Sequence, residues 1–262
     1  MITQYHKFAL TATLGLVAMA FIFSCSSDGG GGGGSFGGGK GNDIKNYKTV
    51  VIGSQTWMAE NLNYNVNGSR CLGEGGQVMV VSIDEESKTE TITYTTLSNA
   101  EIQDNCNKYG RLYSWATAMA LPSNCNSSSC VSKISVKHRG ICPSGWHIPS
   151  DDDWEQLIEF AGGKEIAGNK LKATNGWEHN NGNCTNDYKF SALSGGYFGP
   201  DGLDGDISNV YFPIGYRSIW WSSTEFSASI AHNRYLKNKF EGVGMFSDAE
   251  KSFLFSVRCL LD

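Results

Sequence analysis

Short stretches in which apolar and polar residues alternate recur along the chain, and a period of two is typical of half-buried β-strands. Residues 48–58 hold two β-rich runs around Gly53 and Ser54, so we predict a β-hairpin that turns there. Residues 78–83 and 89–94 form a second predicted hairpin around a charged turn. Its second strand is rich in threonine and poor in apolar residues, so we expect an exposed insertion.

Three further strands are predicted in the second half of the chain, over residues 218–224, 231–236 and 253–261. In the last of them, the apolar side chains that share one face are those of Phe253, Phe255, Val257 and Cys259. A terminal strand paired inside a sheet would hold the C-terminal end of the chain in place.

Two segments have the 3.6-residue period of a helix. Apolar residues recur at i, i+3, i+4 and i+7 over residues 112–119, so we predict a helix that ends before Pro122. A second helix is predicted to begin after Ser150, because its hydroxyl suits the N-cap and Asp153 occupies the reciprocal position of a capping box. We therefore interpret the three carboxylates of residues 151–153 as capping groups rather than as catalytic or metal-binding groups.

The N-terminal residues have the pattern of an export signal. Lys7 precedes an apolar run over residues 8–23, which is shorter than the roughly 20 residues of a membrane-spanning helix. The run ends in Ile-Phe-Ser-Cys at residues 22–25, which resembles the bacterial lipobox. We expect a signal peptide over residues 1–24 and a lipid on Cys25, while a plain cleaved signal or a retained anchor helix would fit the same run.

A tether follows the predicted cleavage point. Residues 25–42 are mostly glycine and serine after the cysteine and include six consecutive glycines, so this segment buries almost no side chain and behaves as a flexible coil. A lipid would hold the protein on a membrane through its buried methylene groups. We therefore expect a lipid-anchored protein of the cell envelope, at the outer membrane and exposed on the surface, with its folded domain over residues 43–262.

The composition narrows the class of this domain. Its 220 residues suit one domain of moderate size or two small ones. The chain has 32 glycines and 12% aromatic residues, which favours short strands and long ordered loops over helix bundles. The net charge of −5 does not favour nucleic acid as a partner.

Eight cysteines are present, and seven remain when Cys25 is set aside. In an oxidising compartment these seven are expected to form disulfides, and an odd number leaves at least one outside an intramolecular pair. Cys125 and Cys130 flank a small polar loop that a local disulfide could close. A metal site is the rival interpretation, but the chain has no Cys-x-x-Cys and its five histidines are scattered.

Aromatic residues in the second half of the chain are candidates for binding a sugar ring by apolar contact. The candidates are Trp177, Tyr197, Trp220 and Trp221. Because Trp220 and Trp221 are adjacent in a predicted strand, they should point to opposite faces, and we expect one of them to lie in the core.

A glycine-rich turn carries three carboxylates, those of Asp201, Asp204 and Asp206. Calcium takes six to eight oxygen ligands from flexible loops, so this turn is a candidate calcium site. It lacks the spacing and the closing glutamate of an EF-hand, and a solvated acidic turn explains it as well.

Catalytic motifs do not stand out in the chain. It has no nucleophile elbow, no phosphate-binding loop and no dinucleotide fingerprint. His147 lies in a strand-like block, so we interpret it as a structural residue that makes hydrogen bonds. We therefore expect a protein that is not an enzyme.

Four blocks of sequence follow one known pattern. They are residues 51–62 (VIGSQTWMAENL), 109–115 (YGRLYSW), 142–150 (CPSGWHIPS) and 256–259 (SVRC). Together they resemble the Fibrobacter succinogenes major paralogous domain, and the resemblance covers residues 46–262. That family is common among exported and lipid-anchored bacterial proteins, which implies the same for this chain.

A more distant resemblance concerns the fold. Residues 146–155 are similar to the R-L-P-T-E-x-E-W-E block of formylglycine-generating-enzyme-like domains, which share the C-type-lectin-like fold. This implies an α+β fold with a small twisted antiparallel sheet, two main helices and long loops. It also implies a disulfide between Cys142 and Cys259, and we expect Cys71 and Cys106 to form a second pair.

A binding or adhesion role follows as the leading hypothesis. We expect a surface-exposed lipoprotein whose domain binds a partner, either a polysaccharide or a protein of another surface. Its alternatives are a structural component that assembles with copies of itself and an extracellular enzyme. No cofactor is expected beyond the calcium that the acidic turn would hold.

Overall fold

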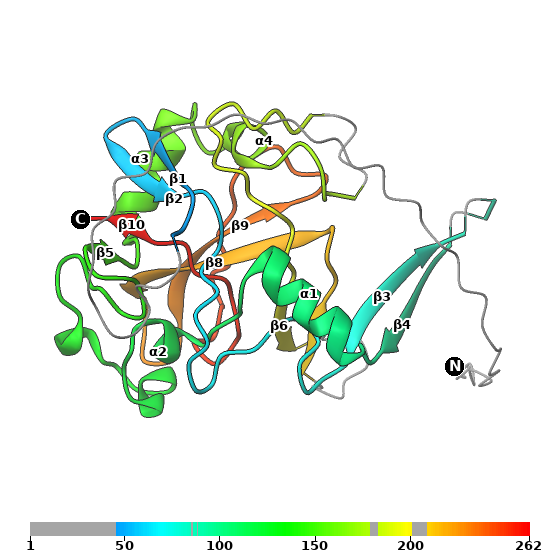
Figure 1. The fold of residues 1–262 in the computed structure, drawn as a ribbon, viewed down its shortest axis with the longest axis horizontal. Coiled ribbons are helices and arrows are strands. Elements are labelled where there is room, and N and C mark those ends of the chain that lie inside the picture. The colour runs from blue at the N-terminus through cyan, green and yellow to red at the C-terminus, as the bar shows by residue number, and fades with distance from the viewer. Residues whose placement is uncertain (1–45, 85, 88, 179–182, 201–208) are drawn as a thin grey trace, which may run out of the picture. The chain divides into compact units, whose positions relative to one another are not determined.

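Two antiparallel strands, β8 (Arg217–Glu225) and β9 (Ala231–Lys237), run through the middle of the domain (Figure 1). They confirm the two strands predicted there. The structure is a computed structural model that describes residues 46–84, 86–87, 89–178, 183–200 and 209–262. Its helices are α1 (Asn99–Tyr109), α2 (Trp115–Ala118), α3 (Asp151–Phe160) and α4 (Ala167–Leu171), with 3₁₀ turns at Ser123–Asn126 and Val131–Lys133.

Strand β8 separates two hydrophobic cores. Trp220 packs with Trp154 of α3 in one core, and Trp221 packs with Phe255 and Trp115 of α2 in the other. The two indoles do point to opposite faces, as adjacent strand residues must. The expectation that only one of them is a core residue was wrong, because each is 1% exposed. A helix covers each face of the strand, so both faces are interior.

The first small sheet joins the two ends of the domain. Its strands lie in the order β1 (Thr49–Ile52), β2 (Gln55–Met58), β10 (Leu260–Leu261) and β5 (Trp146–His147). The predicted hairpin is confirmed: Ile52 pairs with Gln55 across a two-residue turn. Gly53 has a φ of +61°, and a Cβ there would lie 2.9 Å from the Phe160 ring, so glycine is required at this position.

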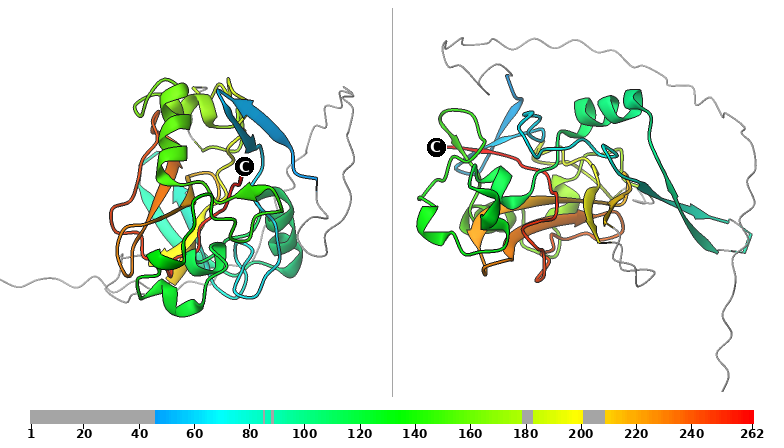
Figure 2. Two further views of the ribbon diagram at one scale, coloured as in Figure 1. Left: turned by 90° about the vertical axis from the view of Figure 1, so that its left-hand side faces the viewer. Right: turned by 90° about the horizontal axis from the view of Figure 1, so that it is seen from below.

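A second sheet carries the predicted insertion. Its order is β4 (Glu90–Thr95), β3 (Val78–Ile83), β7 (Asn209–Phe212) and β6 (Tyr197–Pro200). β3 and β4 pair along their whole length, whereas β3 meets β7 only where Val78 is opposite Tyr211. The β3–β4 ribbon therefore leaves the sheet, and both ribbon diagrams show it extending away from the rest of the domain (Figures 1 and 2).

Helix α3 begins as predicted. The Ser150 hydroxyl accepts a hydrogen bond from the Asp153 amide, and the Asp153 carboxylate accepts one from the Ser150 amide, which completes the capping box. The predicted helix over residues 112–119 is shorter than expected. Leu112 and Tyr113 lie outside α2, because their backbones form bridges to Arg70 and Phe255.

Helix α1 was not predicted from the apolar pattern. Only Cys106 and Tyr109 of its 11 residues are buried, so its sequence has almost no apolar stripe. A capping box marks its start, in which Ser98 and Glu101 exchange hydrogen bonds. That pair of residues is the local signal from which the helix could have been found.

The closing segment of the chain packs as predicted but is not one continuous strand. Phe255, Val257 and Cys259 are buried in the core that contains Trp221, and Phe253 packs against it. Only Leu260–Leu261 forms a strand, because the preceding residues pair singly with several different partners, as in Tyr113 with Phe255.

Three disulfides staple the domain. They join Cys71 to Cys106, Cys125 to Cys130, and Cys142 to Cys259, which are the pairs that the sequence and its resemblances imply. The remaining cysteine of the folded domain, Cys184, is buried. Cys25 and the rest of residues 1–45 lie outside the described residues.

The domain is thus an α+β structure with several small sheets and few helices. In the part of the chain that the structure describes, no helix is long and apolar enough to cross a membrane. The expected signal peptide and lipid anchor concern residues that are not described and stay predictions.

Replacing both cysteines of a disulfide by alanine should destabilise the domain in the order of the loops that the disulfides close. The sequence separations are 117 for Cys142–Cys259, 35 for Cys71–Cys106 and 5 for Cys125–Cys130. In the chain-entropy model these correspond to losses of about 5, 4 and 2 kcal/mol. Urea unfolding of the three double variants measures them, and equal losses would contradict the entropic explanation.

Candidate functional site

A buried arginine lies where three of the four sequence blocks described above come together. Arg258 is 1% exposed, and its Nε and Nη2 atoms donate to Oδ1 of Asn61 at 3.2 and 2.9 Å. The same oxygen accepts a hydrogen bond from Trp220 Nε1 at 2.8 Å, while Asn61 Nδ2 donates to the Tyr109 carbonyl at 2.9 Å. One asparagine therefore joins the first, second and last blocks to strand β8.

Aromatic rings complete the surroundings of this charge. The guanidinium carbon of Arg258 lies 4.2 Å from the centre of the Phe190 ring and 5.7 Å from that of Trp220. Its Nη1 atom donates to the Phe190 carbonyl. Desolvation lowers the pKa of Arg258 to about 9, which the charge of Glu60 partly opposes. The Arg258 site is therefore a structural centre in which the hydrogen bonds of a buried cation go to neutral oxygens.

Two histidine–carboxylate pairs tie helix α3 to its neighbours. His147 Nδ1 lies 2.7 Å from Oδ1 of Asp262, and its Nε2 lies 3.6 Å from Oδ2 of Asp153. On the other side of the helix start, Asp151 contacts His232 at 3.0 Å and Arg234 at 2.6 Å. His147 is 2% exposed, which agrees with the structural role predicted for it.

An aromatic hollow of about 350 Å³ opens beside the closing segment. It is lined by Tyr197, Phe246, Asp248, Ala249, Glu250, Phe253 and Phe255. Tyr197, Phe246 and Phe253 are half-buried, so part of each ring faces the hollow, whereas Asp248 and Glu250 are exposed. The hollow thus combines apolar ring faces with two carboxylates.

Buried polar groups and stacked rings hold the aromatic hollow in shape. The Tyr197 ring stacks on Phe212 with centroids 4.2 Å apart, and burial raises the pKa of its hydroxyl to about 12. The Arg217 guanidinium carbon lies 4.9 Å from the centre of the Phe246 ring. The fully buried Asn233 donates to the Phe246 carbonyl and accepts from its amide, so the chain is fixed where it enters the hollow.

A second, polar hollow of about 480 Å³ lies beside the buried arginine. Its polar side chains include Lys48, Glu60, Asn107, Lys108, Asn175 and Asn186. Among the described residues, no aromatic side chain lines it. The described part of the polar hollow therefore lacks the aromatic ring faces expected of a sugar site.

The predicted ligand-binding aromatics separate into two groups in the structure. Tyr197 lines the aromatic hollow, whereas Trp177, Trp220 and Trp221 are at most 6% exposed. The indole nitrogens of these three residues donate to the Ala192 carbonyl, to Asn61 and to the Tyr113 carbonyl. They pack inside the domain, so none of them offers a ring face to a ligand in this structure.

Sequence reasoning missed most of the aromatic hollow. Phe246 and Phe253 are separated from Tyr197 by some 50 residues, and no periodic pattern connects them. The alternation of carboxylates and small residues around Asp248 and Glu250 was the only local hint.

The structure does not test the predicted calcium site. Asp201, Asp204 and Asp206 lie outside the described residues. Within those described, no group of three or more histidine, cysteine or acidic side chains is placed to hold a metal ion.

Comparison with known proteins gives one result. The family model of the Fibrobacter succinogenes major domain matches residues 50–260, which include the aromatic hollow, the buried arginine and every lining residue of the polar hollow except Lys48. Searches of curated proteins and of solved structures found no match.

Asn61→Ala should destabilise the domain by about 3 kcal/mol, because it leaves the buried charge of Arg258 and the Trp220 indole nitrogen without their acceptor. Urea unfolding measures the loss. Asn107→Ala is the matched control, since Asn107 is exposed and should change stability little. Similar losses in both variants would contradict the role given to Asn61.

The cap of helix α3 should make stability depend on pH. Burial raises the pKa of Asp153, but the nearby His147 ring at 3.6 Å and the hydrogen bonds from Ser150 outweigh this and hold the pKa below its usual value. The unfolded pKa is about 3.9, so the stabilisation is complete above about pH 5 and is lost as the pH falls through the folded value.

Asp153→Asn should therefore cost about 1–2 kcal/mol at pH 7 and should lose less stability than the wild type between pH 7 and pH 3. Thermal unfolding across this range measures both effects. Asp152→Asn, in the same helical turn but exposed, should keep the wild-type pH dependence. A parallel decline of the wild type and Asp153→Asn would refute the assignment.

Proposed function

The chain belongs to the Fibrobacter succinogenes major domain family, and we propose that its domain is a non-enzymatic binding module that recognises carbohydrate. The aromatic hollow is the observation that carries this proposal. It is the place among the described residues where a predicted ligand-binding aromatic, Tyr197, meets other partly exposed rings and exposed carboxylates.

The chemistry of the aromatic hollow fits a sugar ring. Sugars have apolar C–H faces that pack on aromatic rings, which Tyr197, Phe246 and Phe253 would supply. Their hydroxyl groups donate hydrogen bonds, and ionised carboxylates such as those of Asp248 and Glu250 only accept them. A concave site with apolar walls and a few polar groups is the usual form of a small-ligand site.

We propose a C-type-lectin-like arrangement for the fold. Three features support it: the small sheet that joins the two ends of the domain, the Cys142–Cys259 disulfide between a central segment and the closing one, and the long loops of the second half. Because this scaffold carries many functions, the proposal of sugar binding rests on the aromatic hollow and not on the fold.

The cellular setting of the proposal comes from the N-terminal sequence. A lipid on Cys25 and a glycine-rich tether would place the domain outside the cell, at the outer membrane, where polysaccharides and the proteins of other surfaces are accessible. A structural role in which copies of the chain pair with one another is the second candidate. The edge of β4, whose residues are nearly all exposed, supports it.

A glycan array probed with the purified full chain tests the proposal. We expect saturable binding to at least one glycan, weakened about tenfold or more by Phe246→Ala or Tyr197→Ala, because each removes a ring face. Phe226→Ala is the matched control, since this ring is 66% exposed and lies outside the aromatic hollow. Loss of binding on adding a chelator would point to calcium at Asp201, Asp204 and Asp206.

Two outcomes would contradict the proposal. One is a folded chain that binds no glycan on the array. The other is glycan binding that Phe246→Ala, Tyr197→Ala and Phe226→Ala leave equally strong. Near-ultraviolet circular dichroism of each variant separates loss of the aromatic hollow from loss of the fold.

A further inference from the structure

A groove of about 620 Å³ lies between the β3–β4 ribbon and the body of the domain. One wall is β3, a second is the N-terminal half of α1, and the third is the loop that follows β7. Its apolar lining residues include Leu72, Val80, Val81, Leu97, Pro213 and Ile214. An open apolar groove of this kind is typical of an interaction site, because exposing apolar surface to water is unfavourable in free energy.

The backbone of β3 has an unused edge in this groove. Asp84 donates its amide to Thr89 of the opposite strand, so the even-numbered residues of β3 bond to β4. Gln77 accepts from Tyr211, so the odd-numbered residues face β7. Pairing with β7 ends at Val78, and Pro213 then ends β7 itself.

The main-chain groups of Val81 and Ile83 consequently face the groove. Among the described residues, none supplies a backbone partner to them on that side. From Met79 to Ile83 the edge is about 16 Å long at the usual rise per strand residue. That is room for a short extended segment to add as a further strand.

The charge around the groove has one sign. Glu101, Asp104 and Glu178 line it, and no lysine or arginine does so within the described part of the chain. Tyr216 also lines the groove, and desolvation together with the charges of Glu178 and Glu90 raises the pKa of its hydroxyl. The groove therefore favours a cationic occupant.

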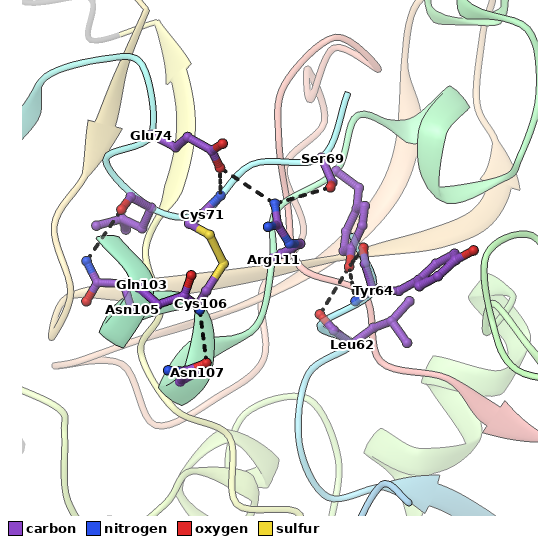
Figure 3. Close-up of a disulfide and its surroundings, with 12 residues drawn as sticks. Leu62, Tyr64, Ser69, Cys71, Glu74, Gln103, Asn105, Cys106, Asn107 and Arg111 are labelled. Carbon is purple, nitrogen blue, oxygen red and sulfur yellow. Dashed lines mark hydrogen bonds and ion pairs between the residues drawn. A yellow bond between two sulfur atoms is a disulfide. The ribbon is translucent and has the colours of Figure 1, made fainter. Parts of the chain in front are cut away.

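The wall formed by α1 is rigid. The Cys71–Cys106 disulfide fastens the helix to the segment that leads to β3, and Glu74 of that segment accepts from the Cys71 amide and contacts Arg111 at 3.6 Å (Figure 3). Leu97 packs against Gly73, where a Cβ would lie only 2.8 Å from its side chain. A preformed groove has little ordering cost when it binds a partner.

We propose that this groove captures an extended peptide segment in which lysine or arginine alternates with apolar residues, and that the segment adds as a strand to the free edge of β3. Main-chain hydrogen bonds to Val81 and Ile83 would hold it in register. Its apolar side chains would pack on the apolar lining residues of the groove. Its cations would face the carboxylates of Glu101, Asp104 and Glu178. This is recognition by strand addition, in which the backbone gives affinity and alternate side chains give specificity.

Fluorescence anisotropy with a labelled Lys-Val-Lys-Val-Lys-Val-Lys peptide and the purified full chain tests the proposal. We expect saturable binding that weakens with added salt. Val81→Pro should weaken it at least about tenfold, because it removes an outward-facing amide donor without removing a bond to β4. Val51→Pro is the matched control: Val51 is 69% exposed on the edge strand β1, and its amide also points outward.

A second pair of variants keeps the test valid if Val81→Pro does not fold. The double variant Asp104→Asn, Glu178→Gln should weaken the peptide about fivefold, while Asp152→Asn, Glu159→Gln, which removes two exposed carboxylates of α3, should not. Equal binding to the two double variants would overturn the proposal, and so would equal binding of a Glu-Val-Glu-Val-Glu-Val-Glu peptide. Concentration-dependent dimers that Val81→Pro abolishes would assign the groove to a second copy and also overturn it.

Discussion

The fold depends on placing the charge of Arg258 in its interior. Arg258 is buried against two aromatic rings, and its hydrogen bonds go to neutral oxygens of Asn61 and Phe190. Removing a guanidinium from water is costly, and the cost is recovered only when every acceptor is in place. Those acceptors and rings come from the chain after β2, the loop near Phe190, and strand β8. The closing segment therefore has its full set of stabilising contacts only when these parts of the domain are also in their native positions.

This requirement explains why β8 is buried on both faces. Trp220 donates to Asn61 and completes the surroundings of Arg258, while Trp221 donates to the Tyr113 carbonyl on the opposite side. One strand thus fixes the position of both cores. Side chains on such a strand are committed to packing and hydrogen bonding, so binding surfaces have to come from the loops and the inserted ribbon around it.

The features that the sequence predicts depend on neighbouring residues, whereas the features that it does not predict depend on residues far apart in the chain. The first hairpin and the start of α3 follow from neighbouring residues, as in the exchange of hydrogen bonds between Ser150 and Asp153. Helix α1 was not predicted, because the Cys71–Cys106 disulfide and two buried residues stabilise it instead of an apolar stripe. The aromatic hollow was not predicted for a related reason, since Tyr197 and Phe246 are brought together only by the tertiary structure. Period-based reasoning also assigned solvent to one face of β8, where a second core lies.

The aromatic hollow and the buried arginine share one segment of chain, and this would couple the proposed binding to the stability of the domain. Phe253 and Phe255 line the hollow, Ser256 pairs with β8 on either side of Trp220, and Arg258 follows two residues later. A ligand of the proposed kind, if it holds Phe253 and Phe255 in place, would also favour the buried position of Arg258 seen in the structure. Because such a ligand binds the folded state alone, it stabilises the domain by RT ln(1 + [L]/Kd). By the same connection, a substitution that loosens the Arg258 site would weaken the proposed ligand binding without changing the residues that touch the ligand.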